Sequence, residues 1–246
     1  MNVTIKQFKD SEELSRNAAE YIVDQAEKCI LDHGFFSLVL SGGSTPRRLY
    51  EQLAGDQCRR RISWDKTHIF WGDERCVPPD HFDSNYNMTA QALLSKVPLP
   101  ERNIHRIKGE IAIPNEAAIQ YEAEIGDFFR NHTAAIGDFP AFDLVLLGVG
   151  NDGHTASLFP GSDILTEKKR WVATSQAPPE MAVRDRITLT IPVINHASGV
   201  IFLVSGESKR DVVQIIIEDP GRNELYPSAM IRADGEIVWF VDFDVY

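Results

Sequence analysis

The sequence predicts an α/β fold: a mainly parallel, doubly wound, Rossmann-like sheet flanked by helices in a single domain of residues 1–246. Two observations lead to this prediction. Four apolar runs alternate with helical patterns: FFSLVLS (35–41), THIFWGDE (67–74), FDLVLLGVG (142–150) and GVIFLVSGES (199–208). Each run ends in a polar or glycine-rich loop, and such short apolar runs are typical of strands buried on both faces of a parallel sheet.

The first helix is predicted from its ends and its periodicity. Asp10 or Ser11 is the expected cap, and apolar residues recur at helical spacing from Leu14 to Ile30. Gly34 is the expected end, because glycine readily adopts the left-handed conformation that closes a helix.

The remaining elements follow the same rules. In GGSTPRRLYEQLA, Thr45 is the expected cap and Pro46 the first helical residue. Residues 84–94 and 115–129 are predicted helices, 186–192 and 236–243 predicted strands, and 176–185 a surface loop. We find no internal repeat and no linker that would divide the chain.

The composition indicates a globular protein with an acidic surface. The 246 residues are 43% hydrophobic, enough for a sizeable core, and the formal charge of −11 disfavours nucleic acid and anionic membranes as partners. The N-terminus has no apolar segment, and no run of about 18 apolar residues occurs. Three scattered cysteines favour a reducing compartment over a disulfide framework or a zinc site. We therefore expect a cytoplasmic protein.

Ligands of open parallel sheets bind beyond the carboxyl ends of the strands, so the loops there are the candidate site. The loop Ser41 to Thr45 combines glycines, hydroxyls and a helix N-terminus, which together make either an anion cradle or a capped turn. It lacks the GK[ST] ending of a nucleotide P-loop.

Two further strand ends carry charge. Asp73, Glu74 and Arg75 follow their strand directly, either as site residues or as a solvated strand end. Lys209 lies in the first helical turn after another strand, where the helix dipole disfavours a cation. A bound anion would account for it, although an exposed helix lysine is the alternative.

The segment GVGNDGH has the spacing G-x-G-x-x-G, in Gly148, Gly150 and Gly153. A dinucleotide site is disfavoured, because Asp152 would bring a carboxylate to the pyrophosphate position and a Pro-Gly pair soon interrupts the helix. His154 is then either a proton-transfer group or a structural hydrogen-bonding residue.

Four ordered motifs resemble one known family: LSGGSTPRRLYEQL (40–53), WGDER with SNY (71–86), LLGVGNDGHTASLFPGS (146–162) and RITLTIPVIN with FLVSGESK (186–209). They are similar to 6-phosphogluconolactonase, of the superfamily that also contains glucosamine-6-phosphate deaminase. The resemblance implies hydrolysis of 6-phospho-D-glucono-1,5-lactone to 6-phosphogluconate in the oxidative pentose phosphate pathway. We expect no cofactor and no metal, because the sequence has nothing like H-E-x-x-H or C-x-x-C, and the oligomeric state stays open.

The same resemblance suggests a role for each candidate residue. His154 is expected to activate water as a general base, with Asp152 orienting the imidazole. Arg75 or backbone amides would stabilise the oxyanion, and the role of Asp73 stays open because the matching deaminase position is a proton-transfer base. The expected phosphate ligands are Gly42, Gly43, Ser44, Thr45, Lys209 and Arg186, with Arg184 as a competitor for the role of Arg186.

Two alternative functions belong to the same superfamily. The deaminase motif continues with a glutamate at the position of Phe159, and a phenyl ring cannot transfer a proton. A non-catalytic sugar-phosphate sensor would carry a DNA-binding helix-turn-helix, for which we expect no room before the first strand and helix. The lactonase is therefore the predicted function.

Overall fold

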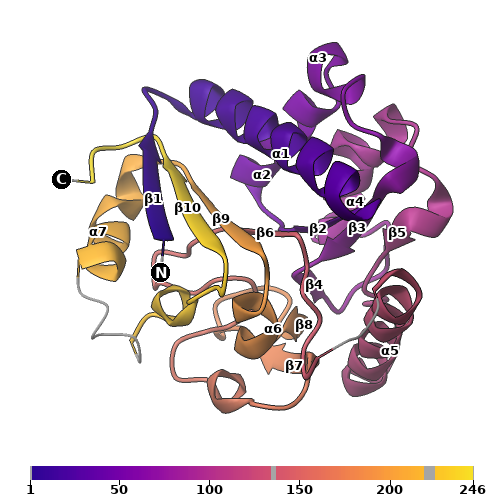
Figure 1. Cartoon of the computed structure of the whole chain (residues 1–246). Coiled ribbons are helices and arrows are strands. Elements are labelled where there is room, and N and C mark those ends of the chain that lie inside the picture. Colours follow the sequence, from indigo (N-terminus) through magenta and orange to yellow (C-terminus); the bar gives the residue numbers. More distant parts are fainter. Residues whose placement is uncertain (1, 134–136, 219–224, 246) are drawn as a thin grey trace.

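The computed structural model describes residues 2–133, 137–218 and 225–245. Its centre is a seven-stranded sheet in which every pair of neighbouring strands is parallel (Figure 1). The strand order is β1 (Asn2–Gln7), β10 (Glu236–Val241), β9 (Gly199–Val204), β6 (Leu144–Leu147), β2 (Phe36–Leu40), β3 (Thr67–Trp71) and β5 (Ile104–His105). The predicted parallel α/β fold is confirmed.

Helices cover the sheet, with α1 and α2 across its top and α5 below it in the view of Figure 1. They are α1 (Ser11–His33), α2 (Ser44–Leu53), α3 (Asp56–Arg59), α4 (Asn85–Ala92), α5 (Pro114–His132), α6 (Ile191–Asn195) and α7 (Arg210–Glu218). Strands β2, β3, β6 and β9 are buried along their whole length, as their apolar sequences predict.

The helix ends agree with the sequence in α1 and differ in α2. The Asp10 carboxylate accepts two backbone N–H bonds at the start of α1, and Gly34 closes the helix at φ 92°. The expectation that Thr45 caps α2 is wrong: the helix begins at Ser44 and its cap is Gly43, which makes no side-chain capping bond. Because φ at Gly43 is 113°, this position favours glycine.

A second sheet of three antiparallel strands lies beside the carboxyl edge of the first. It contains β4 (Asp73–Arg75), β8 (Asp185–Leu189) and β7 (Val172–Gln176), in that order. The predicted strand 186–192 therefore exists largely as β8, but it pairs outside the parallel sheet. The amide of Leu189 donates to the Gly72 carbonyl at 2.8 Å, which joins the two sheets directly after β3.

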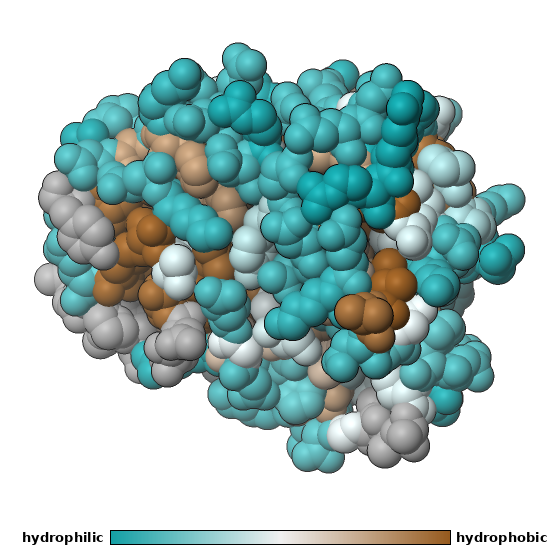
Figure 2. Space-filling view, turned by 45° about the horizontal axis from the view of Figure 1, so that its top comes forward, coloured by the Kyte–Doolittle hydropathy of each residue, from teal (hydrophilic) through white to brown (hydrophobic). Residues whose placement is uncertain are grey.

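The face shown in Figure 2 is mostly hydrophilic, as the charge of −11 predicts. Apolar side chains gather on its left, and residues of β1, β10 and α7 line a groove of about 320 Å³ with Ala229 and Ile231. In the described residues, no helix combines the length and the hydropathy that a membrane crossing requires.

Candidate active site

A cavity of about 260 Å³ lies at the carboxyl edge of the parallel sheet. It is bounded by the loops that follow β2, β3, β6 and β9, where the sequence places its candidate residues. The lining residues are Ser41, Gly42, Gly43, Asp73, Arg75, Asn85, Gly148, Val149, Gly150, His154, Ala156 and Lys209. Four segments that are distant in sequence thus meet at one polar site, as expected for an open parallel sheet.

Two buried tyrosines fix the strand ends that border this cavity. The Tyr50 hydroxyl accepts a bond from the Ser41 amide at 3.0 Å and donates to the Ser41 carbonyl at 2.6 Å. The Tyr121 hydroxyl makes the same pair of bonds with Trp71, at 2.9 and 3.0 Å. Burial raises the pKa of both phenols. Since buried backbone groups need partners where a ladder ends, each tyrosine stabilises the point at which its strand turns toward the site.

The loop after β2 has the form of an anion cradle. Gly42 cannot be replaced without a rearrangement, because a Cβ there would lie 1.9 Å from the Asn85 amide oxygen. Helix α2 has no side-chain cap, so its first amides, at Ser44 and Thr45, have no capping acceptor. Its N-terminal dipole favours negative charge at the cavity, although only Gly42 and Gly43 of the four predicted cradle residues line it.

His154 and Asp152 form a hydrogen-bonded pair after β6. The imidazole Nδ1 lies 2.6 Å from the Asp152 carboxylate, which also accepts the His154 amide at 3.2 Å. Burial opposes ionisation of Asp152, but the bond to His154 and its charge outweigh it and lower the pKa of the carboxyl group. An ionised carboxylate can only accept, so Nδ1 carries the proton and Nε2 is left as the basic nitrogen.

The glycines of this loop allow its tight path. Gly153 adopts φ 77°, and a Cβ there would lie 2.4 Å from the Tyr226 ring. The Gly153 carbonyl accepts two bonds from Ser228, from the amide at 3.0 Å and the hydroxyl at 2.7 Å. A Cβ on Gly150 would lie 2.1 Å from the His154 ring. Of the three glycines, Gly150 therefore allows His154 to pack closely, Gly153 makes room for Tyr226, and a Cβ on Gly148 would have nothing within 4 Å.

Asp73 is buried at the start of β4 and is held on two sides. One carboxylate oxygen accepts a hydrogen bond from the Ser157 hydroxyl at 2.6 Å, and the other accepts one from the side-chain amide of Asn85 at 3.3 Å. Its neighbour Glu74 points away and binds the N-terminus of α4, accepting bonds from Ser84, Asn85 and Tyr86. Glu74 thus positions α4, whereas Asp73 faces the cavity.

Three cations surround the site. Arg75 and Arg186 face each other across the β4–β8 pair, and burial together with the charge of Arg75 lowers the pKa of Arg186. The Nε atom of Arg75 is buried without a hydrogen-bond partner in the described residues. Burial also lowers the pKa of Lys209, and the charge of Asp152 partly opposes this. Desolvated cations of this kind are stabilised when an anion binds between them.

Of the predicted site residues, two arginines are placed apart from the cavity wall. Arg186 does not line the cavity but lies behind Arg75. Arg184 lines a different hollow with Phe159 and Pro178, and its Nε donates to the Ala177 carbonyl at 3.2 Å. Arg186 is therefore the better placed of the two to add positive charge to the site.

Phe159 is buried against the catalytic candidate. Its ring centroid lies 4.9 Å from that of His154, so the residue that distinguishes the two chemistries of the superfamily forms an apolar wall beside the imidazole.

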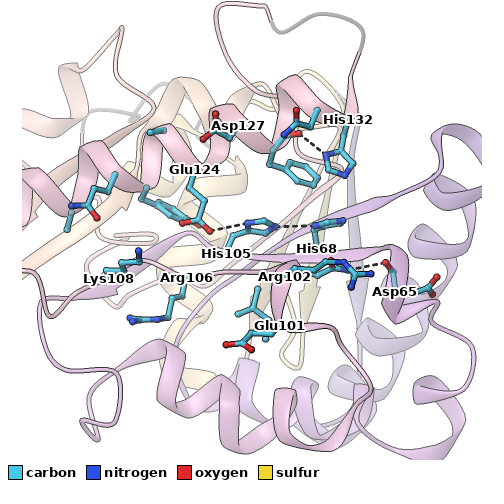
Figure 3. Close-up of a pocket in the computed structure, with 18 residues that line it drawn as sticks. Asp65, His68, Glu101, Arg102, His105, Arg106, Lys108, Glu124, Asp127 and His132 are labelled. Atoms are coloured by element: carbon cyan, nitrogen blue, oxygen red, sulfur yellow. Dashed lines mark hydrogen bonds and ion pairs between the residues drawn. The ribbon is translucent and has the colours of Figure 1, made fainter.

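A larger cavity, about 860 Å³, lies elsewhere, between β3, β5 and α5 (Figure 3). Glu124, His105 and His68 form a row there: His105 Nδ1 is 3.1 Å from the Glu124 carboxylate and His105 Nε2 is 3.1 Å from His68 Nδ1. Burial lowers the pKa of His68 to about 3, with smaller effects of His105, His132 and Arg102. None of the predicted site residues lines this cavity, so we assign the site to the smaller one.

Sequence reasoning missed three residues that shape the site. Asn85 and Ser157 bind Asp73, and Ser228 binds the loop of His154. Asn85 and Ser157 lie within motifs that carry the family resemblance, so those motifs were the available signal. Ser228 comes from a distant segment, and nothing in the sequence points to it.

The fold and the site define a class of α/β protein in which a polar cavity at the carboxyl edge of a parallel sheet carries a hydrogen-bonded His–Asp pair. The chain matches the family model described as "Glucosamine-6-phosphate isomerases/6-phosphogluconolactonase" over residues 9–239 and belongs to that family.

Named relatives are similar over nearly the whole chain. A 6-phosphogluconolactonase of Synechocystis sp. is 42% identical over 229 residues, which cover 93% of this chain and 91% of the relative. One of Nostoc sp. is 39% identical over 242 residues, 98% and 96% of the two chains. The structure of 6-phosphogluconolactonase from Thermotoga maritima superposes with a TM-score of 0.81 at 31% identity, covering 98% and 99%. That from Trypanosoma cruzi gives 0.86 at 33%, covering 100% and 97%.

Proposed function

We propose that this protein is an enzyme that hydrolyses 6-phospho-D-glucono-1,5-lactone to 6-phospho-D-gluconate, the second step of the oxidative pentose phosphate pathway. The observation that carries the proposal is the His154–Asp152 pair, 2.6 Å apart, at a cavity that also holds an uncapped helix N-terminus and two cations. The relatives named 6-phosphogluconolactonase support the choice of substrate.

His154 is the general base of the proposed reaction. Its Nε2 takes a proton from water while the water oxygen forms a bond to the lactone carbonyl carbon. The bond between that carbon and the ring oxygen then breaks, and the ring oxygen takes the proton from the imidazolium. Asp152 accepts a hydrogen bond from Nδ1–H throughout, which holds the ring in the reactive tautomer and stabilises its charged form.

The phosphate is proposed to bind where positive charge and free donors gather. The cavity-lining Gly43 begins the N-terminus of α2, and Lys209 and Arg75 line the same cavity. Arg186 adds positive charge next to Arg75, with which it pairs across strands β4 and β8. The Gly150 amide is occupied, since it donates to the His154 carbonyl at 2.8 Å, so the amides of Gly148 and Val149, which line the cavity, remain for the oxyanion.

The second chemistry of the family is disfavoured by Phe159. Deamination of glucosamine 6-phosphate needs ring opening and proton transfer between carbons, and therefore several positioned acids and bases. Phe159 supplies an apolar ring 4.9 Å from His154, where the deaminase motif has a glutamate. Hydrolysis of a lactone needs only one base and a water molecule, which this site provides.

The decisive experiment offers both substrates to the purified protein. We expect hydrolysis of 6-phosphogluconolactone above its spontaneous rate, followed as acid release, and no ammonia from glucosamine 6-phosphate. Both substrates carry a phosphate and a similar ring, so binding alone does not separate them. Ammonia release at a comparable rate would refute the assignment, and binding without turnover of either would favour a sugar-phosphate sensor.

We also propose a cytoplasmic location and a single domain over residues 1–246. All three cysteines, Cys29, Cys58 and Cys76, are free thiols, as is usual in a reducing compartment. The formal charge of −11 supports a small-molecule ligand rather than nucleic acid or an anionic membrane.

A further inference from the structure

Three metal-ligating side chains meet at the amino edge of the sheet, opposite the active-site cavity. Cys29 and His33 belong to the last turns of α1, and Asp143 directly precedes β6. One ligand atom of each, a thiol sulfur, an imidazole nitrogen and a carboxylate oxygen, lies within 4.8 Å of the other two. No other group of three such residues is this close in the described parts of the chain.

Two of the three ligand atoms are spaced nearly as tetrahedral zinc requires, and the Cys29 sulfur lies within 4.8 Å of both. Cys29 and His33 are four residues apart and therefore lie on one face of α1. His33 Nε2 and Asp143 Oδ1 are 3.0 Å apart. Zinc bonds of about 2.0–2.2 Å to nitrogen and oxygen place two such ligands roughly 3.3 Å apart at the tetrahedral angle. A zinc ion thus needs only a small adjustment of His33 and Asp143, while the Cys29 side chain, within 4.8 Å of both, completes the ligand set by turning toward the ion.

The carboxylate is already oriented for this role. Asp143 Oδ2 accepts bonds from the Ser37 amide at 2.7 Å and the Ser37 hydroxyl at 2.8 Å. The other oxygen, Oδ1, faces the His33 ring. The His33 ring is in edge contact with Phe35, their centroids 4.4 Å apart. Outer partners that orient ligands in this way are a regular feature of metal sites.

We propose that Cys29, His33 and Asp143 form a binding site for one Zn²⁺ ion, with water as the fourth ligand. A mixed sulfur, nitrogen and oxygen donor set suits zinc better than magnesium or calcium, which prefer oxygen alone. The ion connects the C-terminal turn of α1 to the amino end of β6. Strand β6 and its flanking residues separate it from Gly148 by roughly 16 Å, at about 3.3 Å per residue, so its role is structural.

The test measures zinc affinity by competition with a chromophoric chelator, and thiolate ligation by the charge-transfer band of the Co²⁺-substituted protein. The full-length protein is compared with Cys29→Ser, His33→Ala and the matched control Cys58→Ser. Cys58 is also a free thiol, but it lies near Glu20 and outside the cluster. Circular dichroism establishes that each variant is folded.

We expect one zinc ion per chain and a cobalt–thiolate band in the wild type and in Cys58→Ser. Cys29→Ser should lose the band, and Cys29→Ser and His33→Ala should each bind zinc at least about 100-fold more weakly, since even outer-sphere changes cost 10- to 100-fold. Lactone hydrolysis should be unchanged in both variants. Equal zinc affinity in Cys29→Ser and wild type would overturn the proposal, as would a site lost in His154→Ala instead. Neither outcome bears on the proposed lactonase activity.

Discussion

Polar side chains have different surroundings at the two ends of strand β6. At the carboxyl end, His154, which is bonded to Asp152, lines a polar cavity with two cations, and the Gly153 carbonyl of its loop accepts a bond from the distant Ser228. At the amino end, polar groups lie among aromatic rings: His132 stacks on Phe128 with centroids 4.3 Å apart. The first end leaves the Arg75 Nε and the N-terminus of α2 without a side-chain partner in the described residues, whereas the second pairs or buries its polar groups.

This difference decides which histidine can transfer a proton. His68 lines a cavity more than three times larger than that of His154, but burial keeps its pKa near 3, so it is neutral at physiological pH. His154 instead has a carboxylate on one nitrogen and the cavity on the other. Cavity size is therefore a poor guide to function here, and unpartnered donors facing a cavity are a better one.

The largest expected effect is that of His154→Ala. Loss of the general base should lower turnover of 6-phosphogluconolactone by about 100- to 10,000-fold after subtraction of the spontaneous rate, with the fold intact. The matched control is His132→Gln at the amino edge, which should retain wild-type turnover. Near-wild-type turnover of a folded His154→Ala protein would remove the proposed role, and equal losses in both variants would remove the distinction between the two edges.

A smaller effect is expected for Lys209→Gln. Loss of one charged hydrogen bond to phosphate should cost about 1.5–3 kcal/mol, or roughly 10- to 150-fold in kcat/KM. The control Arg184→Gln should be close to wild type, because Arg184 lines a different hollow.

The unphosphorylated lactone separates phosphate binding by Lys209 from any other effect of the substitution. It should be a poor substrate for the wild type, and Lys209→Gln should leave its kcat/KM almost unchanged. An equal loss on both lactones would show that Lys209 acts on the fold or the chemistry rather than on phosphate.

Much of the fold was predictable because apolar runs and glycine-rich loops follow directly from the parallel sheet. The pattern of residues 186–192 predicted a strand, but periodicity does not say which strand it pairs with. Strand β8 pairs with β4 and β7, outside the parallel sheet. Thr45 was expected as a cap from residue preference, yet the left-handed backbone of Gly43 starts α2 earlier. Tertiary contacts decide both points.

The candidate site was predictable to the extent that it lies in strand-end loops. His154, Asp152, Asp73, Arg75 and Lys209 lie together as that rule predicts. Side chains that arrive from elsewhere could not be found, because Ser228 is 75 residues from the Gly153 carbonyl that it binds. The zinc cluster was missed for the same reason: no short motif joins Cys29 to Asp143, and only the fold brings them together.

The last prediction concerns stability rather than catalysis, at the amino edge of the sheet. The pKa of His68 is near 3 in the folded protein and about 6.5 in the unfolded chain, so below pH 6.5 only the unfolded chain gains this proton. The free energy of unfolding should therefore fall as the pH is lowered from 6.5 toward 3, by up to about 1.4 kcal/mol per pH unit from this group. His68→Asn removes the group, and its urea-unfolding free energy should decline less steeply over that range while matching the wild-type slope above pH 7. Identical slopes below pH 6.5 would mean that His68 takes up its proton in the folded protein as readily as in the unfolded chain, and the contrast with His154 would then lose its physical basis.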